Sequence, residues 1–293
     1  MQFEADIIKA LQMYSNDFLD ALQKFFSFFG TETLFLVVAV VLYWCIDKAF
    51  AHRFFNVYIL GVAVTNVLKL GFKRTRPFNA YPDTVRSIGD PETTYSFPSG
   101  HTESISSVSA MLTIKYGKKH IAVPIVGAVL TILVMLSRMY LGQHYLSDVF
   151  CGLTCGVFCS IAFNALLSLF GSKEEFMIIP AVVLSATLIG VLAGMDLLQS
   201  GADILKGVGA FLAFDVGYFI EKRFVKYDVK ANAKWYKYLL RLVLGIGVTI
   251  AVQQTFKLFL PESMPMLYCF LRYFVMAIWA SLAAPALFKA IKI

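Results

Sequence analysis

Long runs of apolar residues, separated by short polar segments, are the dominant pattern of this chain. The hydrocarbon core of a bilayer is about 30 Å thick, and an α-helix of about 20 apolar residues crosses it. The runs of this kind predict about nine transmembrane helices, and therefore an all-α, polytopic membrane helix bundle. They cover residues 25–46, 54–72, 101–117, 120–141, 145–170, 176–196, 205–220, 238–259 and 270–288.

The residues before the first run follow a different pattern, in which apolar and charged positions are interleaved. Ile7, Ile8 and Leu11 alternate with Asp6 and Lys9, and the pattern continues to residue 24. This spacing predicts an amphipathic helix that lies in the membrane interface. No cationic stretch followed by a short apolar run opens the chain, so we expect no cleaved signal peptide.

Composition supports the membrane assignment and removes one class of partner. Hydrophobic residues make up 58% of the 293 residues and charged residues only 15%, against about 25% charged in soluble domains. The net charge of +7 would suggest a nucleic-acid partner in a soluble protein. Here the Lys and Arg residues lie in short segments between apolar runs, as membrane topology requires. We therefore expect no nucleic-acid binding.

The distribution of Lys and Arg also predicts the orientation. If nine spans alternate across the bilayer, one face carries fifteen of these residues and the other eleven. Cytoplasmic segments are enriched in Lys and Arg, so the richer face, which includes the carboxyl terminus, is expected to be cytoplasmic. Segment 72–100 and the turn at 138–144 then open on the extracytoplasmic side. The fifteen are Lys48, Arg53, Lys115, Lys118, Lys119, Lys173, Lys222, Arg223, Lys226, Lys230, Lys234, Lys237, Arg241, Lys289 and Lys292.

All five cysteines fall in apolar runs. Cys151, Cys155 and Cys159 recur every fourth residue and share one face of a predicted helix. No His or carboxylate accompanies them at ligand spacing, so we expect no metal site and no disulfide framework. Together with Gly152 and Gly156 they instead predict a close contact between two helices.

A first polar cluster lies at the end of the second run. It reads Lys69-Leu-Gly-Phe-Lys-Arg-Thr-Arg76-Pro77 and holds four cations in eight residues. A single lysine here could simply extend its ammonium to the interface. Charge beside a membrane core is costly, however, and four cations together are typical of a site that binds an oxyanion.

A second cluster, Ser96-Phe-Pro-Ser99-Gly100-His101, opens the third run. A glycine-containing turn into a helix presents free backbone N–H groups and the positive end of the helix dipole, which together bind phosphate. Ser99 fits either a helix cap or a phosphate donor. His101 follows directly. This third run is the least apolar, because it is rich in serine and contains Glu103.

A third cluster, Ser137-Arg138-Met-Tyr-Leu-Gly-Gln-His144-Tyr-Leu-Ser-Asp148, joins the fourth and fifth runs. His144 and Asp148 are four residues apart, so on one helix they would share a face and hydrogen-bond. A carboxylate on one ring nitrogen fixes the tautomer and leaves the other nitrogen as a nucleophile. A purely structural His–Asp pair is the alternative.

The three clusters together resemble the signature of the type-2 phosphatidic acid phosphatase superfamily, over about residues 50–165. The matching pattern is Lys-x6-Arg-Pro, then Pro-Ser-Gly-His, then Ser-Arg-x5-His-x3-Asp. That superfamily includes lipid phosphate and polyprenyl pyrophosphate phosphatases, glucose-6-phosphatase, sphingosine phosphate phosphatases and soluble vanadium haloperoxidases. The four last runs lie outside the resemblance.

The resemblance implies a role for each matched residue. His144 would be the nucleophile, oriented by Asp148, and His101 the general acid. The remaining matched groups, Lys69, Arg76, Ser99, Gly100 and Arg138, would bind phosphate. Phosphoryl transfer needs mainly positioning and charge stabilisation, which three cations supply, so no metal or other cofactor is expected. Lys73, Arg74 and Arg86 lie outside the motif and would attract an anionic substrate or contact lipid headgroups.

The sequence thus predicts an interfacial helix over 1–24, a catalytic phosphatase core over 25–172, and additional transmembrane helices over 173–293. The expected function is a metal-independent membrane phosphatase that hydrolyses a lipid phosphate monoester or pyrophosphate through a phosphohistidine intermediate. A phosphatase of a soluble sugar phosphate such as glucose-6-phosphate is an alternative. Another is a non-catalytic lipid or anion transporter, in which Asp215 and Gln253–Gln254 would line a polar path. The headgroup and the oligomeric state are not indicated.

Overall fold

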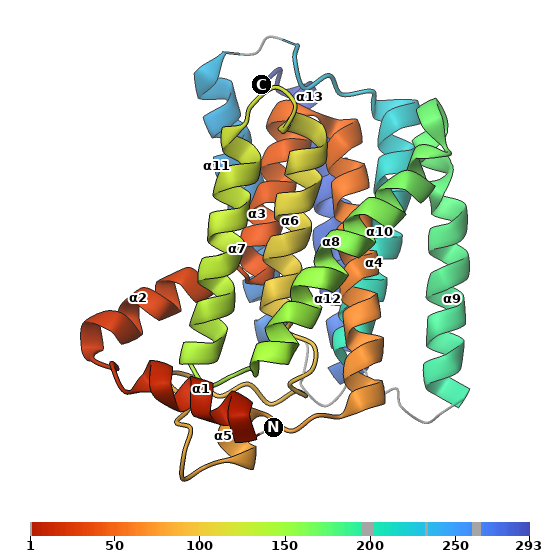
Figure 1. The fold of residues 1–293 in the computed structure, drawn as a ribbon. Coiled ribbons are helices and arrows are strands. Elements are labelled where there is room, and N and C mark those ends of the chain that lie inside the picture. The colour runs from red at the N-terminus through yellow and green to blue at the C-terminus, as the bar shows by residue number, and fades with distance from the viewer. Residues whose placement is uncertain (1, 195–201, 232–233, 260–264) are drawn as a thin grey trace. The chain divides into compact units, whose positions relative to one another are not determined.

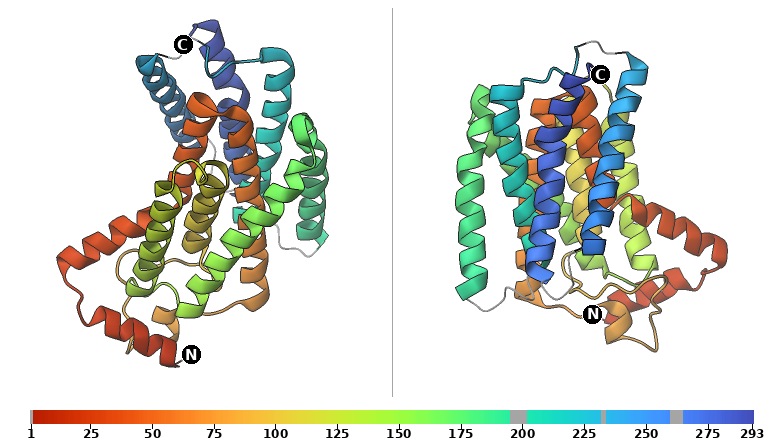
Figure 2. Two further views of the ribbon diagram at one scale, coloured as in Figure 1. Left: turned by 45° about the horizontal axis from the view of Figure 1, so that its top comes forward. Right: turned by 180° about the vertical axis from the view of Figure 1, so that it is seen from behind.

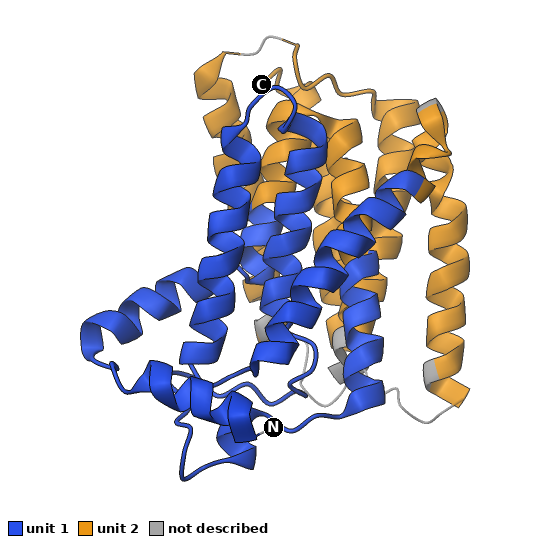
Figure 3. Ribbon diagram, in the orientation of Figure 1, with its two compact units in different colours: residues 1–37, 60–165 blue, residues 38–59, 166–293 orange. Residues whose placement is uncertain are grey.

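The computed structural model describes residues 2–194, 202–231, 234–259 and 265–293, and every regular element in them is a helix (Figure 1). The chain divides into two compact units, one of residues 1–37 and 60–165 and one of residues 38–59 and 166–293 (Figure 3). Three helices, α3 (Glu32–Val41), α4 (Lys48–Phe72) and α8 (Leu146–Ser168), contain residues of both units. The all-α prediction is confirmed.

The first unit contains three long helices that frame the polar clusters of the sequence. These are α6 (Gly100–Tyr116), α7 (Ala122–Tyr140) and α8 (Leu146–Ser168). The short helices α1 (Gln2–Gln12) and α5 (Pro77–Ala80) lie at one end of these three, beside the segment that connects α5 to α6 (Figures 1 and 2). All three polar clusters reach this same end.

Glycines bring α8 close to α6. A Cβ placed on Gly152 would lie 2.5 Å from the carbonyl oxygen of Ser99, and one on Gly156 would lie 2.6 Å from that of Glu103. Neither approach would be open to a larger residue, so the small residues fix α8 against the first turn of α6. Cys151 and Cys155 lie on the same helix with their sulfur atoms 3.9 Å apart. The predicted close contact of this helix with another is what the structure shows.

Six helices of the described residues are long and apolar enough to cross a membrane, or seven if the bent pair Asp17–Phe28 and Glu32–Ile46 is one span. The chain is a multi-pass membrane protein, but the count of nine spans is not confirmed. The third predicted span is α6, which has only 17 residues and is serine-rich. On α7, Ile125, Val129 and Ile132 are at least half exposed and form one apolar stripe suited to lipid.

The single amphipathic helix expected over residues 1–24 is two helices in the structure, α1 and α2 (Asp17–Phe28). Asn16 ends the intervening turn and caps α2, since its side-chain oxygen accepts a hydrogen bond from the backbone N–H of Leu19 at 3.0 Å. The interfacial location of these helices and the boundaries 1–24, 25–172 and 173–293 stay predictions.

The second unit consists of helices that follow the polar clusters in sequence, together with the start of α4. Its α-helices are α9 (Ile178–Gly194), α10 (Ala202–Ile220), α11 (Trp235–Phe259), α12 (Pro265–Ile278) and α13 (Ala284–Ala290). It also contains a 3-10 turn at Gly171–Met177 and π-helical turns at Leu42–Ile46, Glu221–Val225 and Trp279–Ala283. A Cβ on Gly209 of α10 would lie 2.6 Å from the carbonyl oxygen of Phe270, so α10 and α12 are in close contact. The fully buried Arg241 donates hydrogen bonds to the carbonyl oxygens of Trp44 and Val229.

Candidate active site

The first cluster enters the site through a tight turn at the end of α4. Lys69 lies in the last turn of the helix, and Lys73 adopts a left-handed backbone with φ of 48°. This conformation is unfavourable for a side chain larger than glycine, so the turn stops the helix sharply. The chain then reverses, and Arg76, only 2% exposed, precedes Pro77 in the first turn of α5.

The second cluster forms the amino terminus of α6. The hydroxyl of Ser99 accepts a hydrogen bond from the backbone N–H of Thr102 at 3.4 Å, so Ser99 is the cap of the helix. The backbone N–H of Ser99 donates to the carbonyl oxygen of Asp148 at 3.0 Å, which ties α6 to α8. A Cβ on Gly100 would lie 3.8 Å from the Lys69 ammonium, which places this cation beside the free N–H groups of the first turn.

The third cluster places His144 against Asp148, but not within one helix as expected. His144 lies in the turn that joins α7 to α8, since α8 begins at Leu146. Its Nδ1 is 3.5 Å from Oδ2 of Asp148, and both side chains are almost fully buried. Gly142, with φ of 73°, allows the turn that makes this approach possible.

The two ring nitrogens of His144 have different neighbours. Nη1 of Arg76 lies 3.3 Å from Nε2 of His144, and a guanidinium can only donate. Nε2 therefore presents a lone pair, and the ring proton sits on Nδ1, which faces Asp148. Burial, followed by the positive charges of Arg76 and Arg138, holds the pKa of His144 well below its usual value. The imidazole is thus neutral at physiological pH.

Asp148 is held in place by three hydrogen-bond donors, which the sequence did not foresee. Its Oδ1 accepts from Nη1 of Arg74 at 2.7 Å, and its Oδ2 accepts from the backbone N–H of Tyr145 at 2.9 Å and from the hydroxyl of Ser96. The Arg74 guanidinium also stacks on the Tyr145 ring, 4.0 Å from its centroid. We expected Arg74 to attract substrate or contact lipid headgroups, whereas in the structure it contacts the carboxylate beside the nucleophile.

Arg138 and Arg76 meet at the carboxylate of Glu92, in the segment between α5 and α6, which the sequence did not assign to the phosphate site. Nη2 of Arg76 is 2.6 Å from Oε2 of Glu92, and Nη2 of Arg138 bonds to Oε1 of the same side chain. Nδ1 of His101 lies 3.5 Å from that Oε1. Four cations in the first cluster require a counter-anion, and this imbalance was the available signal for Glu92. The structure therefore gathers Arg76, Arg138 and His101 around the carboxylate of Glu92.

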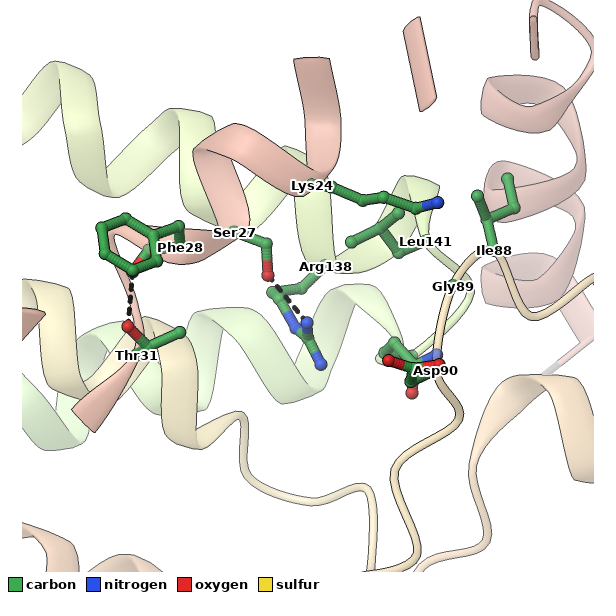
Figure 4. Close-up of a pocket in the computed structure, with 10 residues that line it drawn as sticks. Lys24, Ser27, Phe28, Thr31, Ile88, Gly89, Asp90, Arg138 and Leu141 are labelled. Atoms are coloured by element: carbon green, nitrogen blue, oxygen red, sulfur yellow. Dashed lines mark hydrogen bonds between the residues drawn. The ribbon is translucent and has the colours of Figure 1, made fainter. Parts of the chain in front are cut away.

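A cavity of about 380 Å³ adjoins Arg138 (Figure 4). Its wall includes Ser27 and Phe28 of α2, Ile88 of the connecting segment, and Leu141. The hydroxyl of Ser27 accepts a hydrogen bond from Nη1 of Arg138 at 2.8 Å. Apolar and cationic groups thus meet at the edge of the site. Among the described residues, no group of three His, Cys, Asp or Glu side chains is arranged to hold a metal ion.

Two family models match the chain. Residues 50–171 match the PAP2 superfamily, and residues 205–293 match the transmembrane extension of a PAP2 superfamily phosphatase. This chain belongs to the PAP2 superfamily, which is the type-2 phosphatidic acid phosphatase superfamily of the sequence signature. The family likeness is broader than expected, because it also covers most of the last helices.

Similar proteins come from different kinds of organism. Over 159 residues the chain is 27% identical to the undecaprenyl-diphosphatase of Sulfolobus acidocaldarius, which covers 54% of this chain and 75% of that protein. It is 28% identical to mouse sphingosine-1-phosphate phosphatase 2, covering 47% of this chain and 39% of the relative. With mouse sphingosine-1-phosphate phosphatase 1 it shares 24% identity, covering 78% of this chain. The matches span less than two thirds of both mouse proteins, at 39% and 57%.

Two solved membrane phosphatases are also similar in structure. The PAP2-type phosphatidylglycerolphosphate phosphatase from Bacillus subtilis has a TM-score of 0.47 and 22% identity, covering 56% of this chain and 84% of that chain. LpxE from Aquifex aeolicus has a TM-score of 0.48 and 20% identity, covering 55% of this chain and 94% of that chain.

Proposed function

We propose that this protein is a metal-independent phosphatase of a lipid phosphate or lipid diphosphate that works through a phosphohistidine intermediate. The single observation that carries this proposal is the state of His144. It is buried and neutral, its Nδ1 faces Asp148, and its Nε2 lone pair faces the Arg76 guanidinium. A histidine in this arrangement is prepared to attack an anionic phosphorus centre.

The reaction proceeds by two displacements. Nε2 of His144 attacks phosphorus and forms a P–N bond while the bond to the leaving oxygen breaks, and His101 gives that oxygen a proton. Water then attacks phosphorus while His101 takes up its proton, so the P–N bond breaks, orthophosphate leaves, and both the imidazole of His144 and the protonated His101 are regenerated. Asp148 stabilises the ring while it carries positive charge. The two steps together consume only the phosphate ester and water, and they require no redox partner.

The non-bridging phosphoryl oxygens are held by Lys69, Arg76 and Arg138, with the backbone N–H at Gly100 and the Ser99 hydroxyl beside them. A phosphoryl group in its transition state carries charge on three equatorial oxygens. Three cations and the amino terminus of α6 match that charge in a site shielded from water. Arg76 and Arg138 offer planar guanidinium groups, which bind such oxygens in pairs.

The substrate class is a phosphate on an apolar anchor. The relatives named above are described as acting on undecaprenyl diphosphate and on sphingosine-1-phosphate, and both compounds combine a phosphate with a long apolar tail. The site is built at the ends of helices suited to a membrane, beside a cavity whose wall combines polar groups with the apolar side chains of Phe28, Ile88 and Leu141. A tail in the bilayer would deliver the headgroup to this end of the helices.

The site opens on the extracytoplasmic side, and the carboxyl terminus is cytoplasmic. The support is the distribution of Lys and Arg, which favours the opposite face and the carboxyl end by fifteen residues to eleven. A cysteine introduced at exposed Asp83 and labelled with an impermeant thiol reagent in sealed cells, after removal of the natural cysteines, reports this directly. Labelling that occurs only after the membrane is permeabilised would show that the site faces the cytoplasm and would contradict the proposed orientation.

The function is tested by phosphate release from the purified protein in detergent with EDTA. The panel contains polyprenyl diphosphate, phosphatidate, phosphatidylglycerol phosphate, sphingoid phosphate and glucose-6-phosphate. We expect EDTA-resistant release from a lipid substrate, its loss in His144→Ala, and its retention in His120→Ala, which changes an exposed histidine. Preference for glucose-6-phosphate would replace the lipid class, and turnover in His144→Ala would overturn the mechanism.

A further inference from the structure

Glu92 occupies the centre of the proposed phosphate site. It lies in the segment between α5 and α6, and its side chain is 29% exposed. Its two carboxylate oxygens bond to Nη2 of Arg76, at 2.6 Å, and to Nη2 of Arg138, and Nδ1 of His101 lies 3.5 Å away. The proposed mechanism assigns these three partners to the phosphoryl group and to the leaving oxygen.

The carboxylate is ionised where it lies. Burial alone would raise the pKa of Glu92, but the positive charges of Arg138 and Arg76 outweigh this effect and hold the pKa well below its usual value. Glu92 is therefore an anion at every pH at which the enzyme would work. Its charge is opposite to that of the two arginines and equal in sign to that of a phosphate.

A carboxylate and a phosphate place their oxygens alike against a guanidinium, since both accept paired N–H donors. Nη2 of Arg76 and Nη2 of Arg138 each have a carboxylate oxygen as partner here. A phosphate could take the same donors only after the carboxylate had left them. The negative charges of the Glu92 carboxylate and of a phosphate bound at the same arginines would also repel each other strongly in a buried site.

We propose that Glu92 is a specificity-determining residue, an internal anion that competes with phosphate for Arg76 and Arg138. This inference rests on the proposed function for the identity of the anion that normally displaces it. Orthophosphate gains only the headgroup contacts and binds weakly against this competition. A lipid phosphate adds the burial of its tail and displaces Glu92. Competition by Glu92 therefore leaves lipid phosphates bound and favours the release of the orthophosphate product.

The alternative role for Glu92 is only to hold the two arginines in place. The two roles predict opposite effects of a substitution on the binding of free phosphate. If Glu92 competes, its removal strengthens binding. If it only positions the arginines, its removal weakens binding or leaves it unchanged.

The decisive test is isothermal titration calorimetry of inorganic phosphate into the purified full-length protein in detergent. Glu92→Gln keeps the shape and removes the charge, Glu92→Ala removes both, and Asp83→Asn removes an exposed charge of the same segment. We expect phosphate to bind about tenfold more tightly or better to both Glu92 variants, as for a site that the competitor fills about nine tenths of the time. Asp83→Asn should match the wild type. Equal or weaker binding to folded Glu92 variants overturns the proposal.

A second measurement uses the wild type alone, so it does not depend on whether a variant folds. Hydrogen exchange of the peptide that covers residues 87–97 is followed by mass spectrometry with and without saturating orthovanadate, a phosphate analogue. We expect faster exchange with vanadate, because Glu92 gives up Arg76 and Arg138. Slower or unchanged exchange while vanadate is bound contradicts the competition.

Neither measurement requires turnover, so this inference and the proposed function can fail separately. Tighter phosphate binding to Glu92→Gln, with no hydrolysis of any lipid phosphate by the wild type, retains the anion site and rejects the phosphatase. Hydrolysis of a lipid phosphate, with unchanged phosphate binding in Glu92→Gln, retains the phosphatase and rejects the competitor.

Discussion

Among the described residues there are two buried His–Asp pairs, one in each compact unit, and their environments differ. In the first unit, Nδ1 of His144 lies 3.5 Å from Asp148. In the second, Nε2 of His52 lies 2.6 Å from Oδ1 of Asp215, and both side chains are at most 1% exposed. By the distance between histidine and carboxylate alone, the second pair would be the better catalytic dyad.

The surroundings of the two pairs reverse that ranking. The His52 ring stacks on Tyr218, with centroids 3.8 Å apart and planes at 11°, and the Asn56 amide donates to Asp215 at 3.4 Å. His144 instead has cations beside it. Nη1 of Arg76 lies 3.3 Å from its Nε2, and the positive charge of Arg138 also acts on the ring. A nucleophile for phosphate needs an unprotonated nitrogen, with cations beside it that hold the phosphoryl oxygens. From this comparison we infer that the cations beside His144, and not the His–Asp contact alone, distinguish the proposed active site.

The largest expected effect that separates the pairs is on turnover. His144→Ala should lower the rate of hydrolysis by about 10⁴-fold or more, because the group that forms the covalent bond is gone. Its thermal unfolding in detergent should change less than that of His52→Ala, since Asp148 keeps its hydrogen bonds from Arg74, Tyr145 and Ser96. Initial rates of phosphate release measure the first, and a loss below about tenfold would contradict the assignment.

His52→Ala should show the opposite pattern. It leaves the Asp215 carboxylate buried without its partner, which costs about 3 kcal/mol or more. We expect a lower unfolding temperature and a rate of hydrolysis per folded molecule close to the wild type. Thermal unfolding followed by tryptophan fluorescence, combined with rates on the folded fraction, checks this. Loss of turnover in folded His52→Ala protein would make the second pair part of the chemistry.

Arg74 should act on the rate through Asp148. Its charge-assisted hydrogen bond to Asp148 is of a kind that contributes about 1.5–3 kcal/mol, so Arg74→Ala should lower kcat by about 10- to 100-fold with a smaller change in KM. Arg74→Lys should recover part of the loss. Lys73→Ala, which removes a neighbouring exposed cation, is the matched control. An Arg74→Ala enzyme changed only in KM would instead make Arg74 a contact for the substrate.

The smallest effect concerns pH. His144 must be neutral to attack, and its pKa lies well below the usual 6.5 because of burial, Arg76 and Arg138. The acid limb of kcat/KM should therefore lie below pH 6.5, with activity lost only as the pH falls toward that lowered pKa. Arg138→Gln removes one positive charge and should move the acid limb to higher pH. A profile of kcat/KM against pH that moves to lower pH in this variant would contradict the assigned cause.

The sequence predicted the residues that the structure gathers, because motif residues are spaced to reach one end of a bundle. The cations could be predicted because each lies at the end of a helix or in a turn near His144. They are Lys69 in the last turn of α4, Arg76 directly before α5 and Arg138 in the last turn of α7. The helical class and the membrane class followed from the apolar runs. The exact number of spans could not be predicted in this way. The α6 helix is short, and its buried serines and Glu103 make it polar on the side that faces other helices.

What the sequence could not supply were contacts that depend on the folding of long connecting segments. Glu92 lies in a segment without helical period, so nothing local indicated where its carboxylate would point. The contact between Arg74 and Asp148 joins residues 74 positions apart. The break between α1 and α2 could have been found, since Asn16-Asp17 is a typical start of a helix after an exposed turn.

The central claim is that His144 becomes covalently phosphorylated. It is tested most directly by rapid quench of a reaction with a substrate labelled with ³²P in the transferred phosphate, followed by alkaline work-up and peptide mapping. The account predicts label on the peptide that contains His144 in the wild type, formed at least as fast as product, and absent from His144→Ala. Full turnover without labelled protein, or label on another residue, would contradict it.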